Sequence, residues 1–85
     1  MENILILSNG NPGVSNVLLE ILKINPVFLN HLSIALQLTN SNTSYLWVIY
    51  KNVCNKDINK TMKTLSEWFD NSTETLEDWL NLKYL

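Results

Sequence analysis

The chain has 85 residues, a length that supports a single hydrophobic core, so we expect one domain spanning residues 1–85. Its formal net charge is −2 and it contains no arginine, which argues against DNA as a partner. Hydrophobic residues make up 46% of the chain and charged residues only 16%, a balance that indicates apolar surface buried in an assembly. One cysteine and one histidine are too few ligands for a metal site.

The apolar stretches of the sequence are short. None approaches the ~20 residues of a transmembrane helix, and the first seven residues lack the basic segment of a signal peptide. The lone Cys54 cannot form an internal disulfide. These features predict a cytoplasmic protein that does not contact a membrane.

Two Asn-Pro pairs mark the starts of the first two predicted helices. Asn11-Pro12 and Asn25-Pro26 each place an N-cap before a proline at the first helical position, where the missing N–H costs nothing. We therefore expect helices over residues 12–24 and 26–38. Before them, the apolar residues 4–7 suit a short strand or an extended arm.

Three further helices are expected after the polar segment 39–42. They cover residues 43–54, then 56–69 with Asn55 as the cap, then 73–83 with Asn71 or Ser72 as the cap. Residues 45–50 are rich in aromatic and β-branched side chains, which also suit a strand. The predicted fold is all-α, a small bundle of four to five short helices. If residues 4–7 and 45–50 are both strands, the fold is α+β.

The first two predicted helices carry only narrow polar stripes. Most of their remaining circumference is apolar, more than so small a domain can cover by itself. We therefore predict a homo-oligomer. The stripes are Asn16, Glu20 and Lys23 on the first helix and Asn30, Ser33 and Gln37 on the second, and the predicted oligomer interface is Val27, His31, Ile34 and Leu38.

The fourth predicted helix has the ordinary pattern of a surface helix. One face is apolar and the opposite face is charged and solvated. The apolar face comprises Ile58, Met62, Leu65 and Phe69, and the charged face comprises Lys56, Lys60, Lys63 and Glu67.

The turn before the first helix is the main candidate for a ligand site. Glycines bracket an Asn-Pro helix start, so free N–H groups near Val14 and Ser15 would face an anion. The simpler interpretation is a turn with a helix cap. Aromatic and cationic side chains at helical spacing could stack on a nucleotide-like ligand and pair with its phosphate, although core packing with a lysine at the rim is again the simpler interpretation. The candidate ligand contacts are Gly10, Asn11, Gly13, Trp47, Tyr50 and Lys51.

The sequence shows no catalytic machinery. His31 has no acidic neighbour at helical spacing to orient it, and nothing brings it to Cys54 as a nucleophilic pair. We expect a protein that is not an enzyme and that needs no cofactor.

Gly10–Gly13 reads Gly-Asn-Pro-Gly, residues 47–51 read Trp-x-x-Tyr-Lys, and Cys54 and Asp57 follow. In these motifs, across residues 6–60, the chain resembles small uncharacterised proteins of phages and giant viruses. The resemblance implies a viral protein in the host cytoplasm that inhibits host defence.

Two functional interpretations follow. The first is a non-enzymatic oligomer that sequesters a small anionic, nucleotide-like ligand. The alternative is a protein–protein interaction module that blocks a host protein through an apolar face or the acidic C-terminal helix.

Overall fold

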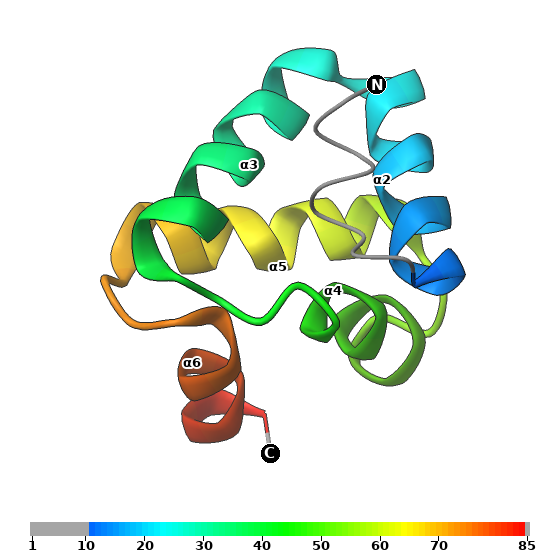
Figure 1. Cartoon of the computed structure of the whole chain (residues 1–85). Coiled ribbons are helices and arrows are strands. Elements are labelled where there is room, and N and C mark those ends of the chain that lie inside the picture. Colours follow the sequence, from blue (N-terminus) through cyan, green and yellow to red (C-terminus); the bar gives the residue numbers. More distant parts are fainter. Residues whose placement is uncertain (1–10, 85) are drawn as a thin grey trace.

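The computed structural model describes residues 11–84, and these residues form helices without a strand (Figure 1). The all-α prediction is confirmed, and residues 45–50 are helical, while residues 4–7 lie outside the described range. The elements are α2 (Pro12–Ile24), α3 (Pro26–Thr39), α4 (Tyr45–Val48), the π-helical turn η1 (Ile49–Val53), α5 (Ile58–Asn71) and α6 (Leu76–Lys83).

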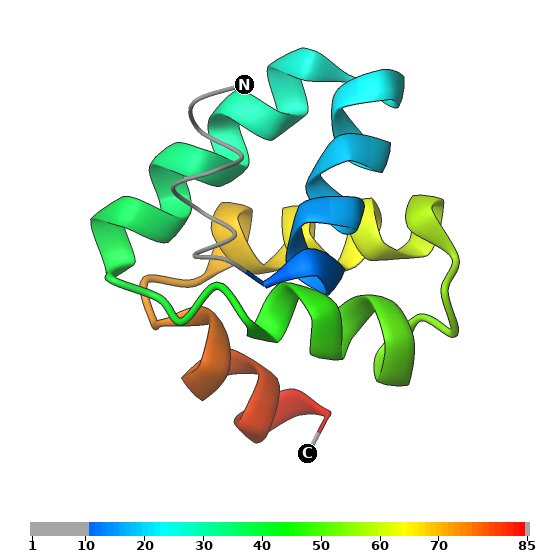
Figure 2. The ribbon, with the colours of Figure 1, turned by 45° about the vertical axis from the view of Figure 1, so that its right-hand side comes forward.

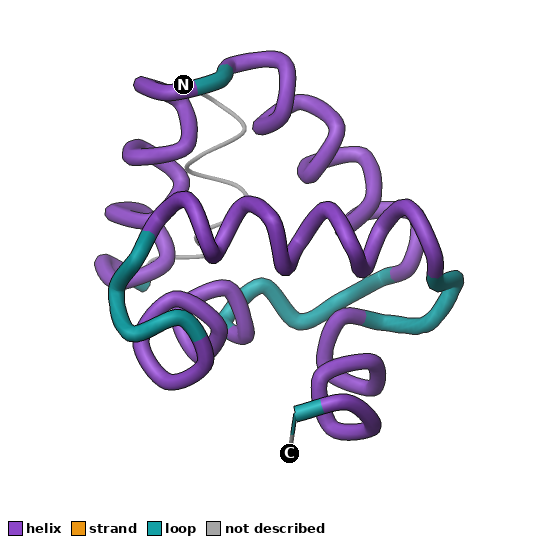
Figure 3. Tube along the Cα trace, turned by 180° about the vertical axis from the view of Figure 1, so that it is seen from behind, coloured by secondary structure: helices purple, strands orange, loops and turns teal. Residues whose placement is uncertain are grey.

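Helix α5 crosses the middle of the molecule. Helices α2 and α3 meet at one corner and rise from α5, while α4, η1 and α6 lie on its other side (Figures 1 and 2). The view from behind shows α5 running in front of the other helices (Figure 3). Among residues 11–84, no helix combines the length and apolar character that crossing a membrane requires.

The first two helices begin where the Asn-Pro pairs predict. The Asn11 side chain accepts hydrogen bonds from the Gly13 and Val14 N–H groups at 2.9 and 3.3 Å. The Asn25 side chain accepts one from the Phe28 N–H at 3.1 Å. These bonds satisfy amide donors that have no partner within the helix.

The predicted caps of the last two helices are wrong. Asn55 adopts a left-handed conformation with φ 54°, so α5 starts later and Asp57 caps it instead. The hydroxyl of Ser72 accepts from the Glu74 N–H in a tight turn, which delays α6 until Thr75 caps it. Both corrections arise from local hydrogen bonds that leave the preceding residues outside helical geometry.

The segment before α5 ends in a π-helical turn. The Cys54 N–H donates to the Ile49 carbonyl five residues earlier at 2.8 Å, so the turn is wider than an α-helical one. Both residues are buried. The wider turn therefore brings both side chains into the core although they are five positions apart.

The core draws on every helix, and its polar members differ from the sequence prediction. Ser33, predicted on the polar stripe of its helix, is buried. The buried face of α5 is centred on Thr61, Thr64 and Leu65, so the predicted Met62 is only half-buried. The buried hydrophobic residues are Val14, Val17, Leu18, Ile21, Leu29, Leu32, Leu36, Leu46, Ile49, Cys54, Leu65, Trp68, Leu76, Trp79 and Leu80.

Polar bonds attach the start of α6 to the segment that follows α3. The Asn42 N–H donates to both carboxylate oxygens of Glu77, at 2.9 and 3.0 Å. The Ser41 hydroxyl accepts from the Leu76 N–H at 2.9 Å. These contacts join residues 35 positions apart, so the place of α6 depends on the packed fold.

The turn before α5 supplies a test of backbone strain. Lys56 has φ 63°, a conformation that costs an L-residue roughly 1–2 kcal/mol, whereas glycine adopts it freely. Glycine loses more conformational entropy on folding, by about 0.5–1 kcal/mol. Lys56→Gly should therefore raise the free energy of unfolding by ~0.5–1 kcal/mol in urea denaturation.

The matched control is Lys63→Gly, at an exposed position inside α5. This change should lower the free energy of unfolding by about 1 kcal/mol. Equal destabilisation by the two substitutions would contradict the strain at Lys56.

Candidate functional site

Three of the predicted ligand contacts lie together in the structure. Trp47 of α4 packs directly over Gly13 in the first turn of α2, where an added Cβ would lie 2.8 Å from the indole Cδ2. The Trp47 and Tyr50 rings are neighbours, with centroids 5.7 Å apart. The fold thus joins the glycine of the first turn to the aromatic pair, as a ligand site would require.

The anion-binding groups expected at this turn are not free. The Gly13 and Val14 N–H groups donate to the Asn11 side chain, and the Ser15 N–H donates to the Asn11 carbonyl at 3.0 Å. The prediction of free amides there is therefore wrong, because Asn11 acts as their cap. Lys51 is exposed on η1, and Gly10 lies outside the described residues.

Contact between Gly13 and the indole gives a direct test of this packing. Alanine ordinarily favours a helix over glycine by about 1 kcal/mol. Here the new methyl group would collide with Trp47. We expect Gly13→Ala to destabilise the protein by ~1–3 kcal/mol in urea denaturation, the usual cost of overpacking.

The control is the same substitution in a Trp47→Ala background, where the methyl group has room. In that background Gly13→Ala should be neutral or stabilising, and the double-mutant cycle isolates the contact. Equal effects in the two backgrounds would show that Trp47 does not rest on Gly13.

A second candidate is the outward face of α3. Val27, Ile34 and Leu38 are 64, 49 and 82% exposed, and His31 is exposed between them. We call these four residues the α3 stripe. They are the residues predicted to form an oligomer interface, and the fold leaves all four at the surface.

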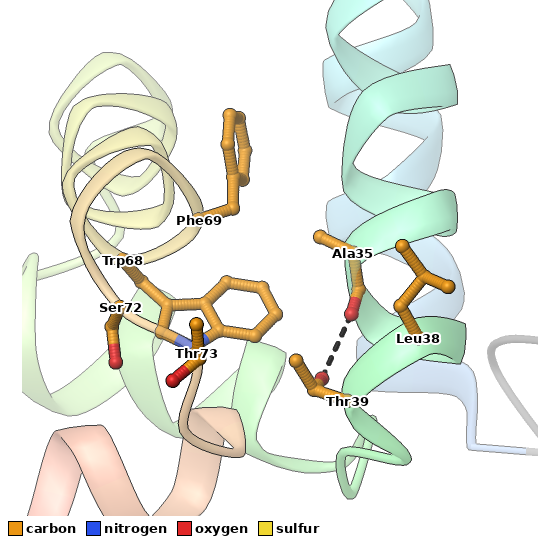
Figure 4. A pocket seen from close by; sticks show the side chains of 7 residues that line it. All are labelled: Ala35, Leu38, Thr39, Trp68, Phe69, Ser72 and Thr73. Carbon is orange, nitrogen blue, oxygen red and sulfur yellow. Dashed lines mark hydrogen bonds between the residues drawn. The ribbon is translucent and has the colours of Figure 1, made fainter.

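Beside the α3 stripe lies an apolar groove between α3 and the end of α5. It has a volume of about 320 Å³, and Figure 4 shows the Trp68 indole pointing across it toward Thr39. A shallower hollow of about 240 Å³ adjoins it. Its walls include three residues of the α3 stripe, His31, Ile34 and Leu38, together with Phe69 and Asp70 of α5. The groove is lined by Ala35, Leu38, Thr39, Trp68, Phe69, Ser72 and Thr73.

The groove exists because a small side chain faces a large one that is only partly covered. Ala35 and Phe69 are both half-buried, and Phe28 supports the Phe69 ring at a centroid distance of 5.4 Å. The Thr39 hydroxyl is occupied, since it donates to the Ala35 carbonyl at 2.8 Å. Apolar carbon therefore forms most of the available surface.

Sequence reasoning did not find the α5 wall of this groove. Phe69 lies on the predicted apolar face of its helix, and that pattern predicts a core residue. Only its position next to Ala35 shows that part of the ring remains accessible. The absence of charge on α3 was the signal in the sequence that this helix forms an apolar surface, because it contains no Asp, Glu, Lys or Arg.

The described residues contain no cluster of three or more histidine, cysteine or acidic side chains that could hold a metal ion. Cys54 is buried with its sulfur 3.5 Å from the Thr64 hydroxyl, whereas His31 lies on the exposed α3 stripe. The structure does not bring the two together as a nucleophilic pair.

Comparison with known proteins supplies no template, since no family model, curated protein or solved structure matches this chain. The resemblance to phage and giant-virus proteins stays a prediction.

Proposed function

We propose that this chain is a non-enzymatic protein-interaction module that works through the α3 stripe and the adjoining groove. The observation that supports this most strongly is the exposure of Leu38, 82% accessible at the edge of an apolar groove. A contiguous apolar patch of this kind in a soluble domain typically marks a binding surface.

The shape and chemistry of the surface favour a helix as the bound element. The α3 stripe runs along one side of a helix, and the groove beside it follows the crossing of α3 and α5. Recognition of an amphipathic helix uses apolar anchors at such spacing, set into an apolar groove. Among residues 11–84, Asp70 is the one acidic or basic residue besides His31 in the walls of the two hollows.

The nucleotide interpretation has weaker support. The half-buried Trp47 and Tyr50 with the exposed Lys51 retain the stacking and cationic groups. The backbone amides that would bind phosphate are occupied by Asn11. We therefore rank a nucleotide-like ligand second and test both sites in one experiment.

The experiment is a ¹⁵N NMR titration of the protein with a stapled amphipathic helix bearing leucines along one face and glutamines elsewhere. We expect saturable shift changes at the amides of Ala35, Leu38 and Phe69. The control peptide has the same composition with its leucines spread around the helix, and it should cause no saturable change. A nucleotide panel is titrated in parallel, with Trp47, Tyr50 and Lys51 as reporters.

Two exposed leucines give matched protein variants. Leu38→Asp should reduce affinity for the leucine helix at least tenfold, because it places a charge on the apolar surface. Leu82→Asp changes an equally exposed leucine, 76% accessible on α6, and should leave binding unchanged. Shift changes confined to Trp47, Tyr50 and Lys51, and caused only by nucleotides, would overturn the proposal.

A further inference from the structure

We infer that the natural occupant of the α3 stripe is the same stripe of a second copy, packed antiparallel across a twofold axis. This inference rests on the proposed function and names its partner. Two observations support it: the order of the side chains along α3 and their exposure to solvent.

The spacing of the α3 stripe reads the same from both ends. Residues 27, 31, 34 and 38 are separated by steps of four, three and four, the alternation of a coiled-coil seam. Two antiparallel copies therefore superimpose stripe on stripe. Val27 then faces the partner's Leu38, and His31 faces the partner's Ile34. A twofold axis requires this reciprocity, because each contact occurs twice.

The residues that flank the stripe also match in this register. On one edge, Asn30 meets the partner's Gln37, and both of these exposed side chains carry amides that can exchange hydrogen bonds. The Gln37 amide nitrogen already approaches the Ser33 hydroxyl at 3.4 Å, which leaves its oxygen as an acceptor. The contact adds polar pairing at the edge of the apolar stripe.

On the other edge a large side chain meets a small one. Phe28 faces the partner's Ala35, the residue that leaves the groove open beside Phe69. Both Phe28 and Ala35 are half-buried within one chain. A large residue opposite a small one allows the two helices to approach closely, as packing at an interface requires.

The absence of charge on α3 permits an identical partner. Helix α3 has no Asp, Glu, Lys or Arg, so a second α3 brings no like charge against the first. In the antiparallel arrangement each helix N-terminus lies near the other's C-terminus, which also opposes the two helix dipoles favourably. The described walls of the adjoining hollows offer an incoming charged helix few opposite charges, since Asp70 is the only carboxylate that residues 11–84 contribute to them.

The interface is small, which sets the expected affinity. Helix α3 has 14 residues and is therefore about 21 Å long. One helix from each copy gives a contact at the lower end of specific interfaces, where complexes are transient. We expect a dimer that dissociates at micromolar concentrations, so measurements should extend well above that range.

Disulfide trapping tests the register. In an antiparallel pair, Val27 of one copy lies beside Leu38 of the other, while two copies of residue 38 lie about 16 Å apart along the axis. An equal mixture of the Val27→Cys and Leu38→Cys variants should form a disulfide-linked dimer under mild oxidation. Each variant oxidised alone should form at least fivefold less of the disulfide-linked dimer. Wild-type protein controls for the buried Cys54.

Self-linking of each variant to the same extent as the mixture would overturn the antiparallel register. Sedimentation of the wild-type protein should show a concentration-dependent dimer, and Ile34→Asp should remove it while Leu82→Asp leaves it. A monomer at every concentration, with the leucine helix still bound at Ala35 and Phe69, would reject the second copy and retain the proposed function. A dimer that forms without any shift change at α3 would also reject the second copy at this stripe, and the proposed function would fall with it only if the leucine helix causes no saturable shift at Ala35, Leu38 and Phe69.

Discussion

The buried indole of Trp68 joins the core to the surface that we propose as functional. It is fully buried near the end of α5, and its Nε1–H donates to the Glu74 carbonyl at 2.9 Å. A buried indole N–H needs an acceptor, so the chain after α5 must fold back over the ring. That return places Ser72 and Thr73 at one end of the groove and delays the start of α6. One side chain thus determines the end of the bundle and a wall of the groove (Figure 4).

The described residues leave no buried polar side chain without a partner, but they leave several large apolar side chains exposed to water. Within residues 11–84, every buried side-chain nitrogen and oxygen has a hydrogen-bond partner. Leu29, Leu32 and Leu36 on the inner face of α3 are at most 6% exposed, so the exposed apolar residues of this helix are no sign of a poorly packed core. A small domain gains stability from each apolar group it buries, so leaving Val27 and Leu38 in water is a cost that a binding partner can recover.

The two candidate sites differ in how completely the chain already occupies them. At the start of α2, the Asn11 side chain caps the amides and Trp47 covers Gly13. These contacts account for the Asn-Pro-Gly sequence as a cap with room for an indole. At α3, the groove has apolar walls and open volume. Open apolar volume favours a protein partner, whereas occupied amides weaken the case for an anion.

Local sequence patterns were sufficient to predict where α2 and α3 begin and which residues form the α3 stripe. Asn-Pro pairs define the starts of α2 and α3 because cap and proline act within a few residues. The shared face of Val27, His31, Ile34 and Leu38 could be predicted from helical periodicity alone, because it depends only on the 3.6-residue turn.

The packed fold decided the rest. Whether residues 45–50 were strand or helix depended on the core they enter, and the π-helical turn serves to bury both Ile49 and Cys54. The α5 cap moved to Asp57 because a left-handed turn precedes it. The groove arises where Ala35 meets Phe69, and no local pattern encodes a contact between residues so far apart. The sequence by itself determined that Val27, His31, Ile34 and Leu38 share one face of α3. Only the tertiary structure decided that a groove lies beside them, because that requires two helices to pack against each other.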